Sequence, residues 1–248
     1  MKISLITVVF NGGNYLKHCI ESVIDQTYTD LEYIVIDGGS TDGSLAIIDQ
    51  YRHHIHQFVS EQDSGMYDAL NKGIKMASGE VIGILNADDM LASPDVIATV
   101  ATCFAANLTD GVYGDLNYVN PQYPSQIIRK WISKPFTRKD FEQGWMPAHP
   151  TLYLKSTLFK HYGDYALDFG SAADYELMLR YFYFFRLNAV YLPKLMVKMR
   201  TGGMSNASLG HRYGALLNDY KALKANKVSL PMYALLLKKI SKIGQFFH

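Results

Sequence analysis

The sequence predicts an α/β fold in which helices flank a mostly parallel central sheet. Three observations support this prediction. Short apolar runs rich in β-branched residues alternate with longer segments of helical periodicity through the first hundred residues. Polar segments follow each apolar run, as they do where strands of such sheets end. The 248 residues, 48% of them hydrophobic, suffice for one large domain with a sizeable core.

Four strand–helix units are predicted in the first half of the chain. Continuous apolar runs such as "ISLITVVF" indicate strands that are buried on both faces. The predicted strands are residues 3–10, 31–37, 56–61 and 80–87, and the predicted helices are residues 14–26, 41–54, 66–77 and 94–107. Ser93 and Pro94 indicate the start of the last helix, as a cap and a first-turn proline.

From residue 111 the pattern changes to strands separated by Pro- and Gly-rich connections. Strands are predicted over 111–119, 125–133 and 189–200, helices over 171–185 and 212–226, and a loop over 141–150. We therefore divide the chain into residues 1–110, residues 111–205 and the C-terminal helices of residues 206–248, with the first two as halves of one domain.

Composition narrows the classes of partner and compartment. The formal net charge is +1 and the pI is near 7.7, so the overall balance does not favour nucleic acid as a partner. Cys19 and Cys103 both lie in apolar helical patterns, which predicts buried free thiols in a reducing compartment. No stretch reaches 18 apolar residues and no signal peptide is evident. We therefore expect a cytoplasmic protein, with peripheral association on the cytoplasmic face of the membrane as a further option.

The ends of the four predicted strands are the expected position of a ligand crevice. In an open parallel sheet, ligands bind beyond the carboxyl ends of the strands, where loop amides and helix N-termini gather. Here all four ends are polar, and three of them carry acids: residues 11–13, 37–43, 61–65 and 86–89. Taken alone, the segment "DGGSTDGS" favours a structural turn and helix cap over a binding loop.

Asp88 and Asp89 are candidate ligands of a divalent cation. The sequence holds neither G-x-G-x-x-G after its first strand nor a P-loop, so the common phosphate-binding loops are not indicated. Adjacent carboxylates would repel a diphosphate unless a cation lay between them, and their oxygens suit Mg²⁺ or Mn²⁺. The structural alternative for this pair is a solvated helix cap.

The segment "TVVFNGGNYLKHCIESVIDQTYTDLEYIVIDGGSTDGS", followed by "GEVIGILNADDM", resembles the family 2 glycosyltransferases. The segment "SEQDSGMYDALNKGIKMASGE" is similar to a bacterial subgroup that builds polysaccharide and O-antigen units. The resemblance implies a GT-A-like nucleotide-sugar-binding fold, with the nucleotide-sugar half in residues 1–110 and the acceptor and catalytic-base half in 111–205. It also implies inverting, Mn²⁺- or Mg²⁺-dependent transfer from a nucleotide diphosphate sugar, usually linked to UDP, to a saccharide or lipid-linked saccharide acceptor in surface polysaccharide biosynthesis.

The resemblance also assigns site residues. The positions it implies for the nucleotide sugar are Thr7, Asn11, Asp37, Gly39, Asp63, Asn71, Lys72, Asn86, Ala87 and Asp88. Asp88 is the implied metal ligand, with Asp89 beside it. Asn86 departs from the family pattern, which has an acid there.

Asp174 is the catalytic base that the resemblance implies. It opens "DYELMLR", and Ala173 stands where the family usually has Glu. The structural alternative is an acid in the first turn of a helix, and Glu176 is a second candidate. The expected contacts to the acceptor or the phosphates are Trp145, His149, Arg200 and Ser205, with a hydrogen-bonded loop imidazole as the alternative for His149.

The C-terminal segment "PMYALLLKKISKIGQFFH" has two interpretations. Its apolar positions share one helical face and its lysines another: Met232, Leu236, Ile240, Ile243 and Phe247, and Lys238, Lys239 and Lys242. It is either a helix docked on the core or an interfacial helix on an anionic membrane. For the chain as a whole, the alternative functions are a nucleotidyltransferase and a non-catalytic protein that binds nucleotide sugars or carbohydrate.

Overall fold

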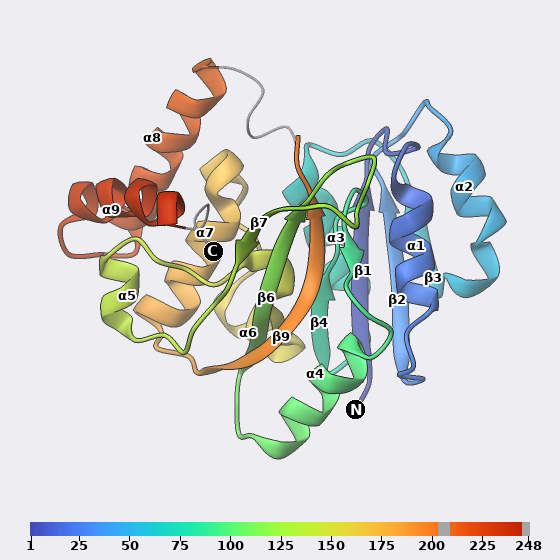
Figure 1. Cartoon of the computed structure of the whole chain (residues 1–248), viewed down its shortest axis with the longest axis horizontal. Coiled ribbons are helices and arrows are strands. Elements are labelled where there is room, and N and C mark those ends of the chain that lie inside the picture. Colours follow the sequence, from blue (N-terminus) through green and yellow to red (C-terminus); the bar gives the residue numbers. More distant parts are fainter. Residues whose placement is uncertain (203–208, 245–248) are drawn as a thin grey trace.

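The computed structural model describes the backbone of residues 1–202 and 209–244, and the side chains of residues 1–202 and 213–238. Within these residues nine strands form one sheet with helices on both faces (Figure 1), so the predicted α/β architecture is confirmed. The strands are β1 Ile3–Val9, β2 Leu31–Asp37, β3 Gln57–Ser60, β4 Val81–Ile84, β5 Met90–Leu91, β6 Gly111–Val119, β7 Ile127–Trp131, β8 Tyr153–Lys155 and β9 Ala189–Arg200.

The helices connect and cover these strands. The α-helices are α1 Leu16–Ile24, α2 Ser44–Gln50, α3 Met66–Met76, α4 Val96–Ala106, α5 Arg138–Glu142, α6 Ser156–Tyr162, α7 Ala173–Met178, α8 Leu209–Ala225 and α9 Pro231–Gly244. The shorter 3-10 helices are η1 Arg52–His54, η2 His149–Thr151 and η3 Leu167–Ala172, and η4 Leu179–Phe184 is a π-helix that continues α7.

Strand order explains how both halves of the chain share one sheet. The order is β3-β2-β1-β4-β8-β6-β9-β5, and β7 pairs with β6. The first four strands are parallel, whereas β8 lies antiparallel between β4 and β6. Because β8 joins β4 to β6, the sheet runs without a break from residues 1–110 into residues 111–205.

Two apolar cores lie on opposite faces of the sheet. Alternate residues of β1 enter different cores: Ile6 and Val8 pack into one, and Ile3, Leu5 and Val9 into the other. Burial on both faces explains why β1 appears in the sequence as an unbroken apolar run. Cys19 and Cys103 are free and buried, as predicted, and burial raises the pKa of the Cys19 thiol to about 12.

Several predicted element boundaries were wrong. The predicted loop over 141–150 contains the end of α5 and the start of η2, and the strand β8 was not predicted. Three residues are too few for a periodic signal, and β8 is recognisable only by its partners. Gly83 of β4 leaves room for Tyr153, whose ring would lie 2.2 Å from a Cβ at that position. Ser93 does not cap α4, because its hydroxyl donates to Asp95 Oδ1 at 2.6 Å.

The C-terminal helices pack against other helices: α8 contacts η3 and α7, and α9 contacts α8 and α5 (Figure 1). The backbone of α9 lies directly on Gly144, where an added Cβ would approach Ala234 O to 2.2 Å. In the described part of the chain, no helix has both the length and the apolar character needed to cross a membrane.

Candidate active site

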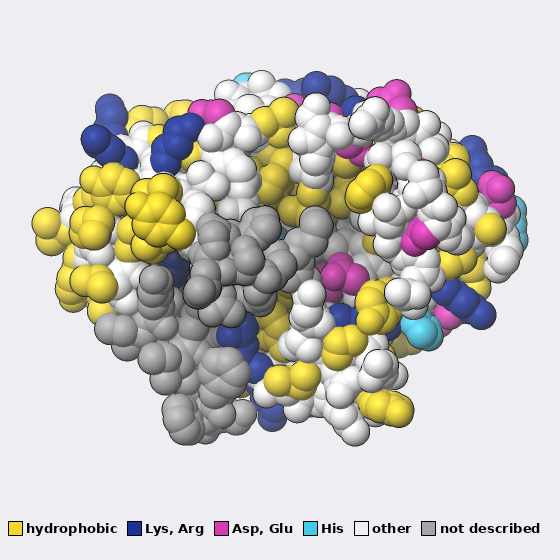
Figure 2. Space-filling model, turned by 90° about the horizontal axis from the view of Figure 1, so that it is seen from above, with side chains coloured by type: hydrophobic (Ala, Val, Ile, Leu, Met, Phe, Trp, Pro, Cys, Tyr) yellow, Lys and Arg dark blue, Asp and Glu magenta, His cyan; other side chains and the backbone are white. Residues whose placement is uncertain are grey.

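The carboxyl ends of the parallel strands meet at one edge of the molecule, as the sequence predicts. The register places Val9 beside Asp37, and Asp37 beside Ser60. Figure 2 views the molecule from this side and shows a hollow near its middle, with apolar side chains in its walls and an acidic side chain at its edge. The loops that follow β1 to β4 therefore surround one crevice.

Asp37 and Asn11 shape the first part of the crevice. The fully buried Asp37 carboxylate accepts hydrogen bonds from the backbone amides of Gly39 and Ser40, and from the Ser60 hydroxyl at 2.7 Å. Gly39 has a φ of 82°, which glycine adopts at little cost. Asn11 accepts from the Thr41 amide at 2.9 Å and ties the β1 loop to the β2 loop.

Thr7 lies away from the crevice. Phe10, which the sequence analysis did not name, lies at the crevice instead. The Thr7 side chain is fully buried and accepts a hydrogen bond from the Tyr33 hydroxyl at 3.2 Å. Phe10 follows β1, is 66% exposed, and packs beside Gly38. An exposed aromatic ring beside an Asp-Gly turn was the available signal. We therefore keep Phe10, and not Thr7, as a candidate for packing on a base.

Lys72 and Asn71 have different roles although they are adjacent. The Lys72 ammonium pairs with Asp63 and, at 2.8 Å, with Glu61, and these two hydrogen bonds raise the pKa of Lys72. Both ends of the Asn71 amide bind the backbone of Tyr165, at 2.9 and 3.0 Å. Asn71 thus joins α3 to the second half of the chain, and its amide is not directed at the crevice.

Asp88 and Asp89 differ sharply in their surroundings. Asp89 is fully buried, and its oxygens accept from the Arg200 amide and the Asn86 side chain, both at 3.3 Å. Burial, and then the charge of Asp88, raise the pKa of Asp89. Asp88 is only partly buried; burial raises its pKa, while Arg200 opposes the rise. Asp88 is therefore the accessible carboxylate, and Asn86 holds Asp89 in place.

Arg200 fixes the loop that carries Asp88. Contrary to the prediction, its side chain does not reach into the crevice. It is 3% exposed and donates to the Asp88 carbonyl at 2.6 Å and the Pro121 carbonyl at 3.1 Å. Its remaining guanidinium nitrogen, Nη2, lies 3.2 Å from His18 Nδ1, and the guanidinium lies over the ring of Tyr15. Ser205, predicted beside it, lies outside the described residues.

The donor set fits a divalent cation that shares its coordination with a ligand. Within the described residues, no three His, Cys, Asp or Glu side chains are grouped closely enough to hold a metal ion. Mg²⁺ and Mn²⁺ sites of this kind use one or two carboxylates and complete their shell with water and phosphate oxygens. Asp88, with Ala87 buried beside it, offers one such carboxylate at the rim of the crevice.

Asp174 and His149 face each other in a contact that the sequence could not indicate. His149 Nδ1 lies 3.1 Å from Asp174 Oδ2, although one residue begins η2 and the other lies in the first turn of α7. Tyr67, in the first turn of α3, also lies near Asp174, whose carboxylate adds to the effect of burial in raising the pKa of Tyr67. Because α3 begins where β3 ends, the pair lies on the crevice side of the sheet.

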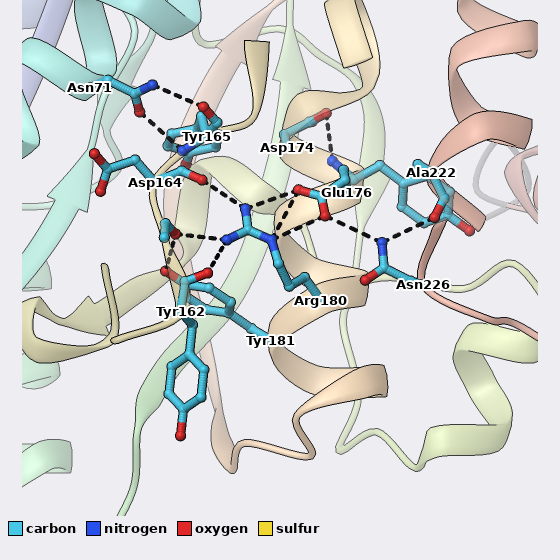
Figure 3. A network of polar contacts seen from close by, with 12 residues as sticks. Asn71, Tyr162, Asp164, Tyr165, Asp174, Glu176, Arg180, Tyr181, Ala222 and Asn226 are labelled. Atoms are coloured by element: carbon cyan, nitrogen blue, oxygen red, sulfur yellow. Dashed lines mark hydrogen bonds and ion pairs between the residues drawn. The ribbon is translucent and has the colours of Figure 1, made fainter. Parts of the chain in front are cut away.

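Glu176 is a structural residue and not a second candidate base. It is 4% exposed and binds the Arg180 guanidinium through both of its oxygens (Figure 3). Arg180 also donates to the carbonyls of Tyr162, Gly163 and Asp164. This network ties α7 to the turn after α6. Ala173 is fully buried, so the side chain that replaces the family's Glu adds no charge to the interior.

Trp145, which was predicted to contact the acceptor or the phosphates, belongs to a cluster of aromatic side chains. Its ring lies 6.3 Å from the rings of Phe136 and Phe141 and 6.5 Å from that of Tyr113. Lys134 lies over the indole, 5.5 Å from the ring centre. The indole is partly buried, so one part of the ring packs in the core and the rest faces outward.

Comparison with known proteins gives consistent matches. The family model described as glycosyl transferase family 2 matches residues 4–162. A Mycobacterium tuberculosis protein named only as an uncharacterized glycosyltransferase is 34% identical over 180 residues, covering 72% of this chain and 68% of its own. A "PGL/p-HBAD biosynthesis glycosyltransferase" of Mycobacterium bovis is 29% identical over 209 residues, covering 82% of this chain and 78% of its own.

Solved structures with similar folds are glycosyltransferases of the GT-A type. S. aureus TarS in complex with UDP-GlcNAc has a TM-score of 0.69 at 17% identity, covering 90% of this chain and 67% of TarS 1-349. The mannosyltransferase PcManGT of Pyrobaculum calidifontis, in complex with GDP-Man and Mn²⁺, has a TM-score of 0.64 at 17% identity, covering 96% of this chain and 68% of its own. The predicted GT-A-like fold is confirmed.

Proposed function

The chain belongs to glycosyl transferase family 2 and is a glycosyltransferase, and from this premise we propose that it transfers a sugar from a nucleotide diphosphate donor with inversion at the anomeric carbon. One observation carries the proposal: the accessible Asp88 and the His149–Asp174 pair both lie at the edge where β1 to β4 end. The first can serve the leaving diphosphate and the second the attacking hydroxyl.

The donor site is assigned to the loops after β1 to β4. Asp37, Gly39 and Asn11 shape the pocket for the nucleoside, with the Phe10 ring exposed beside it. Asp63 and Lys72 form the neighbouring wall. The complexes of TarS with UDP-GlcNAc and of PcManGT with GDP-Man support a nucleotide sugar as the donor class. A UDP-linked sugar is our first choice.

The chemistry is a single displacement. The acceptor oxygen attacks the anomeric carbon opposite the diphosphate, and the His149–Asp174 pair receives the hydroxyl proton. Asp88 would hold Mn²⁺ or Mg²⁺, which when bound neutralises charge on the leaving diphosphate. Arg200 and Asn86 serve this reaction indirectly, because they fix the loop that carries Asp88.

A saccharide or lipid-linked saccharide in surface polysaccharide biosynthesis is the proposed acceptor. The Trp145 ring is partly exposed, and aromatic faces pack well on sugar rings. The bacterial relative named for PGL/p-HBAD biosynthesis supports a glycoconjugate acceptor. The sequence lacks the Q-x-x-R-W signature of processive synthases, which favours addition of one sugar per binding event.

A thermal-shift screen of nucleotide sugars tests the donor assignment. A ligand present at 100 times its Kd stabilises the folded state by about 2.7 kcal/mol, which corresponds to a rise in Tm of roughly 5–10 °C for a domain of this size. We expect this rise with a UDP-sugar and Mn²⁺ together, and a much smaller one with either alone. A screen of UDP-, GDP- and dTDP-sugars in which none raises the Tm would contradict the assignment.

The C-terminal helices are the proposed point of contact with a membrane. Residues 206–248 contain seven Lys and Arg residues and one acidic residue, Asp219, which gives a formal charge of +6. Residues 1–205 contain 17 Lys and Arg residues and 22 acidic residues, which gives a formal charge of −5. Large apolar side chains are also exposed there: Tyr213, Leu217, Leu230, Met232, Tyr233 and Leu236. Figure 2 shows apolar and basic side chains gathered at the left, the side on which Figure 1 places α8 and α9.

The α9 helix is docked on the core through some of its side chains and exposes others. Ala234 and Leu235 are buried against the core, whereas Met232 and Leu236 are 61% and 60% exposed. The side chains of Ile240 and Ile243, and residue Phe247, lie outside what the structure describes. An exposed apolar face on a basic segment is the combination that binds anionic bilayers.

Co-sedimentation with vesicles tests the membrane contact. We expect the full-length protein to bind phosphatidylglycerol-containing vesicles more tightly than phosphatidylcholine vesicles. Replacing Lys224 and Lys227 together by Gln removes about 2 kcal/mol of attraction and should weaken binding at least tenfold. Met232→Ser with Leu236→Ser should also weaken it, whereas Leu108→Ser, at a site that is 96% exposed elsewhere, should not. Equal binding by all variants would refute the contact.

A further inference from the structure

Strand β6, in the middle of the sheet (Figure 1), carries two polar side chains that the proposed reaction does not use. Tyr113 packs into the same core as helix α7, whereas Val112 and Leu116 pack into the core on the other face. Because the side chains of a strand alternate between the two faces of a sheet, Asp115 and Asn117 share the face of Tyr113. These two polar side chains therefore lie on the face that α7 covers.

Both side chains lie beyond the end of β4, at the height of the crevice. Strand β8 is antiparallel to β4 and to β6, so β4 and β6 run in the same direction. Leu154 of β8 is opposite Ile82 of β4 on one side and opposite Gly111 of β6 on the other. From these level positions β4 ends at Ile84, whereas β6 continues to Val119. The two polar side chains of β6 are therefore level with the loop after β4, which carries the accessible carboxylate of the crevice.

The segment η2 lies beside the same part of β6. The Thr151 hydroxyl of η2 accepts a hydrogen bond from the Gly114 amide at 3.1 Å, and Gly114 directly precedes Asp115. His149, the first residue of η2, has its Nδ1 atom 3.1 Å from Asp174 Oδ2. Asp115 therefore follows directly after the residue that anchors η2, the segment that carries one member of the pair assigned to proton transfer.

The Asp115 carboxylate is held by neutral groups. Its Oδ1 accepts from the Ser133 amide at 2.8 Å, and the Tyr191 hydroxyl lies 3.0 and 3.2 Å from its two oxygens. Burial, and then the hydrogen bond to Asp115, raise the pKa of Tyr191 to about 12, so this hydroxyl stays protonated and donates. Within residues 1–202 and 213–238, whose side chains are described, no basic side chain forms an ion pair with Asp115. The carboxylate keeps its charge and can accept further hydrogen bonds.

Two polar side chains next to Asp115 have no hydrogen-bond partner in the described part of the chain. Asn117 is 9% exposed, and its side-chain amide forms no hydrogen bond with the other residues whose side chains are described. Ser133 is 5% exposed, and its hydroxyl is buried without a partner. Buried polar groups are almost always hydrogen-bonded, so an unpartnered pair beside a carboxylate indicates a ligand. We call Asp115, Asn117 and Ser133 the β6 polar site.

We propose that the β6 polar site binds a neutral sugar ring of the acceptor. The inference rests on the proposed function and names residues that hold its acceptor. The Asp115 carboxylate accepts from neighbouring hydroxyls of the ring, and the Asn117 amide both donates and accepts. Trp145, whose ring lies 6.5 Å from that of Tyr113, offers an aromatic surface on which the sugar packs. The loops after β1 to β4 remain free for the nucleotide.

The charge of Asp115 determines the class of sugar that we expect. No basic side chain neutralises this carboxylate among the described residues, so a second carboxylate placed beside it would be repelled. Hydroxyl groups, by contrast, donate to a carboxylate in strong hydrogen bonds. The site should therefore accept neutral sugars and reject uronic acids.

Saturation-transfer NMR with methyl glycosides tests the site without turnover. The probes are the methyl glycosides of glucose, galactose, mannose, rhamnose and glucuronic acid, each added to the full-length protein with UDP and Mn²⁺. We expect at least one neutral glycoside to bind and the glucuronide not to bind. Asp115→Asn should weaken binding of that neutral glycoside at least tenfold, and Asn117→Ala should weaken it roughly threefold or more, the losses expected for a charged and a neutral hydrogen bond.

Matched measurements separate binding from a structural effect. In Asp115→Asn the amide oxygen can still accept from the Ser133 amide and the Tyr191 hydroxyl, so the variant should fold. Asn117→Ala breaks no hydrogen bond among the described residues, and its Tm should fall by less than about 4 °C. Asp110→Asn makes the same chemical change just before β6, where the carboxylate accepts from the Asn188 amide at 3.0 Å, and should leave glycoside binding unchanged.

The outcomes distinguish this proposal from the proposed function. Absence of binding by every neutral glycoside, equal binding by the native protein and Asp115→Asn, or binding of the glucuronide as tight as that of the best neutral glycoside would each overturn the proposal. So would a loss in Asp115→Asn of affinity for a nucleotide sugar but not for UDP, because the site would then hold the sugar of the donor. If no nucleotide sugar bound at all, the proposed function would fail, whereas glycoside binding that depends on Asp115 would still support the site.

Discussion

Replacing Asp174 with asparagine is expected to lower kcat by about 10²- to 10⁴-fold, the range over which general bases contribute to enzyme rates. An amide in place of the carboxylate cannot accept the proton of the attacking hydroxyl, and it also removes the charge that lies 3.1 Å from His149 Nδ1. Donor affinity should change less than about threefold, because Asp37, Asp88 and the other residues assigned to the donor are untouched.

Two matched variants separate this effect from a general loss of structure. Asp49→Asn makes the same chemical change at an exposed position on α2 and should leave kcat unchanged. Glu176→Gln, two residues beyond Asp174, should lower the Tm because Arg180 loses a buried charged partner. A kcat for Asp174→Asn within fivefold of the native value would contradict the assignment of the His149–Asp174 pair to proton transfer.

The architecture of the first half could be predicted because local patterns determine it. The apolar runs of β1 and β2 are bounded by glycine and asparagine, and the side chains after parallel strands must converge at one edge. The positions of Asp37 and Asp88 followed from that rule. The side on which a buried residue lies did not follow, since a strand buried on both faces carries no alternation, and Thr7 proved to point into the core.

The remaining features depend on contacts between distant segments. His149 and Asp174 lie in different elements, and no periodicity relates them. Arg200 was predicted on the phosphate side from its place in the sequence. The strand β5, which begins directly after Asp89, pairs with β9, and this pairing turns the Arg200 guanidinium to the Asp88 carbonyl. The strand β8 has only three residues, and its identity comes from its position between β4 and β6.

Replacing Asp88 and Asp89 one at a time is expected to give opposite results. Asp88→Asn removes the accessible charge and should weaken Mn²⁺-dependent UDP binding at least tenfold, which is about 1.4 kcal/mol. Asp89→Asn should change it less than threefold, because Asp89 is fully buried and an amide oxygen can still accept from the Arg200 amide. The Asn86 side-chain amide can rotate so that it still pairs with the new side chain at position 89. Equal losses in both variants would show that both carboxylates bind the cation.

Calorimetric titration of UDP into the native protein, with Mn²⁺ present and after removal of divalent metal by a chelator, tests the central claim most directly. An acidic crevice that admits a diphosphate only with a cation held by Asp88 predicts that UDP affinity falls at least tenfold when the metal is removed, and that Asp88→Asn abolishes this difference. Tight UDP binding that is indifferent to both the metal and the Asp88 side chain would contradict the claim.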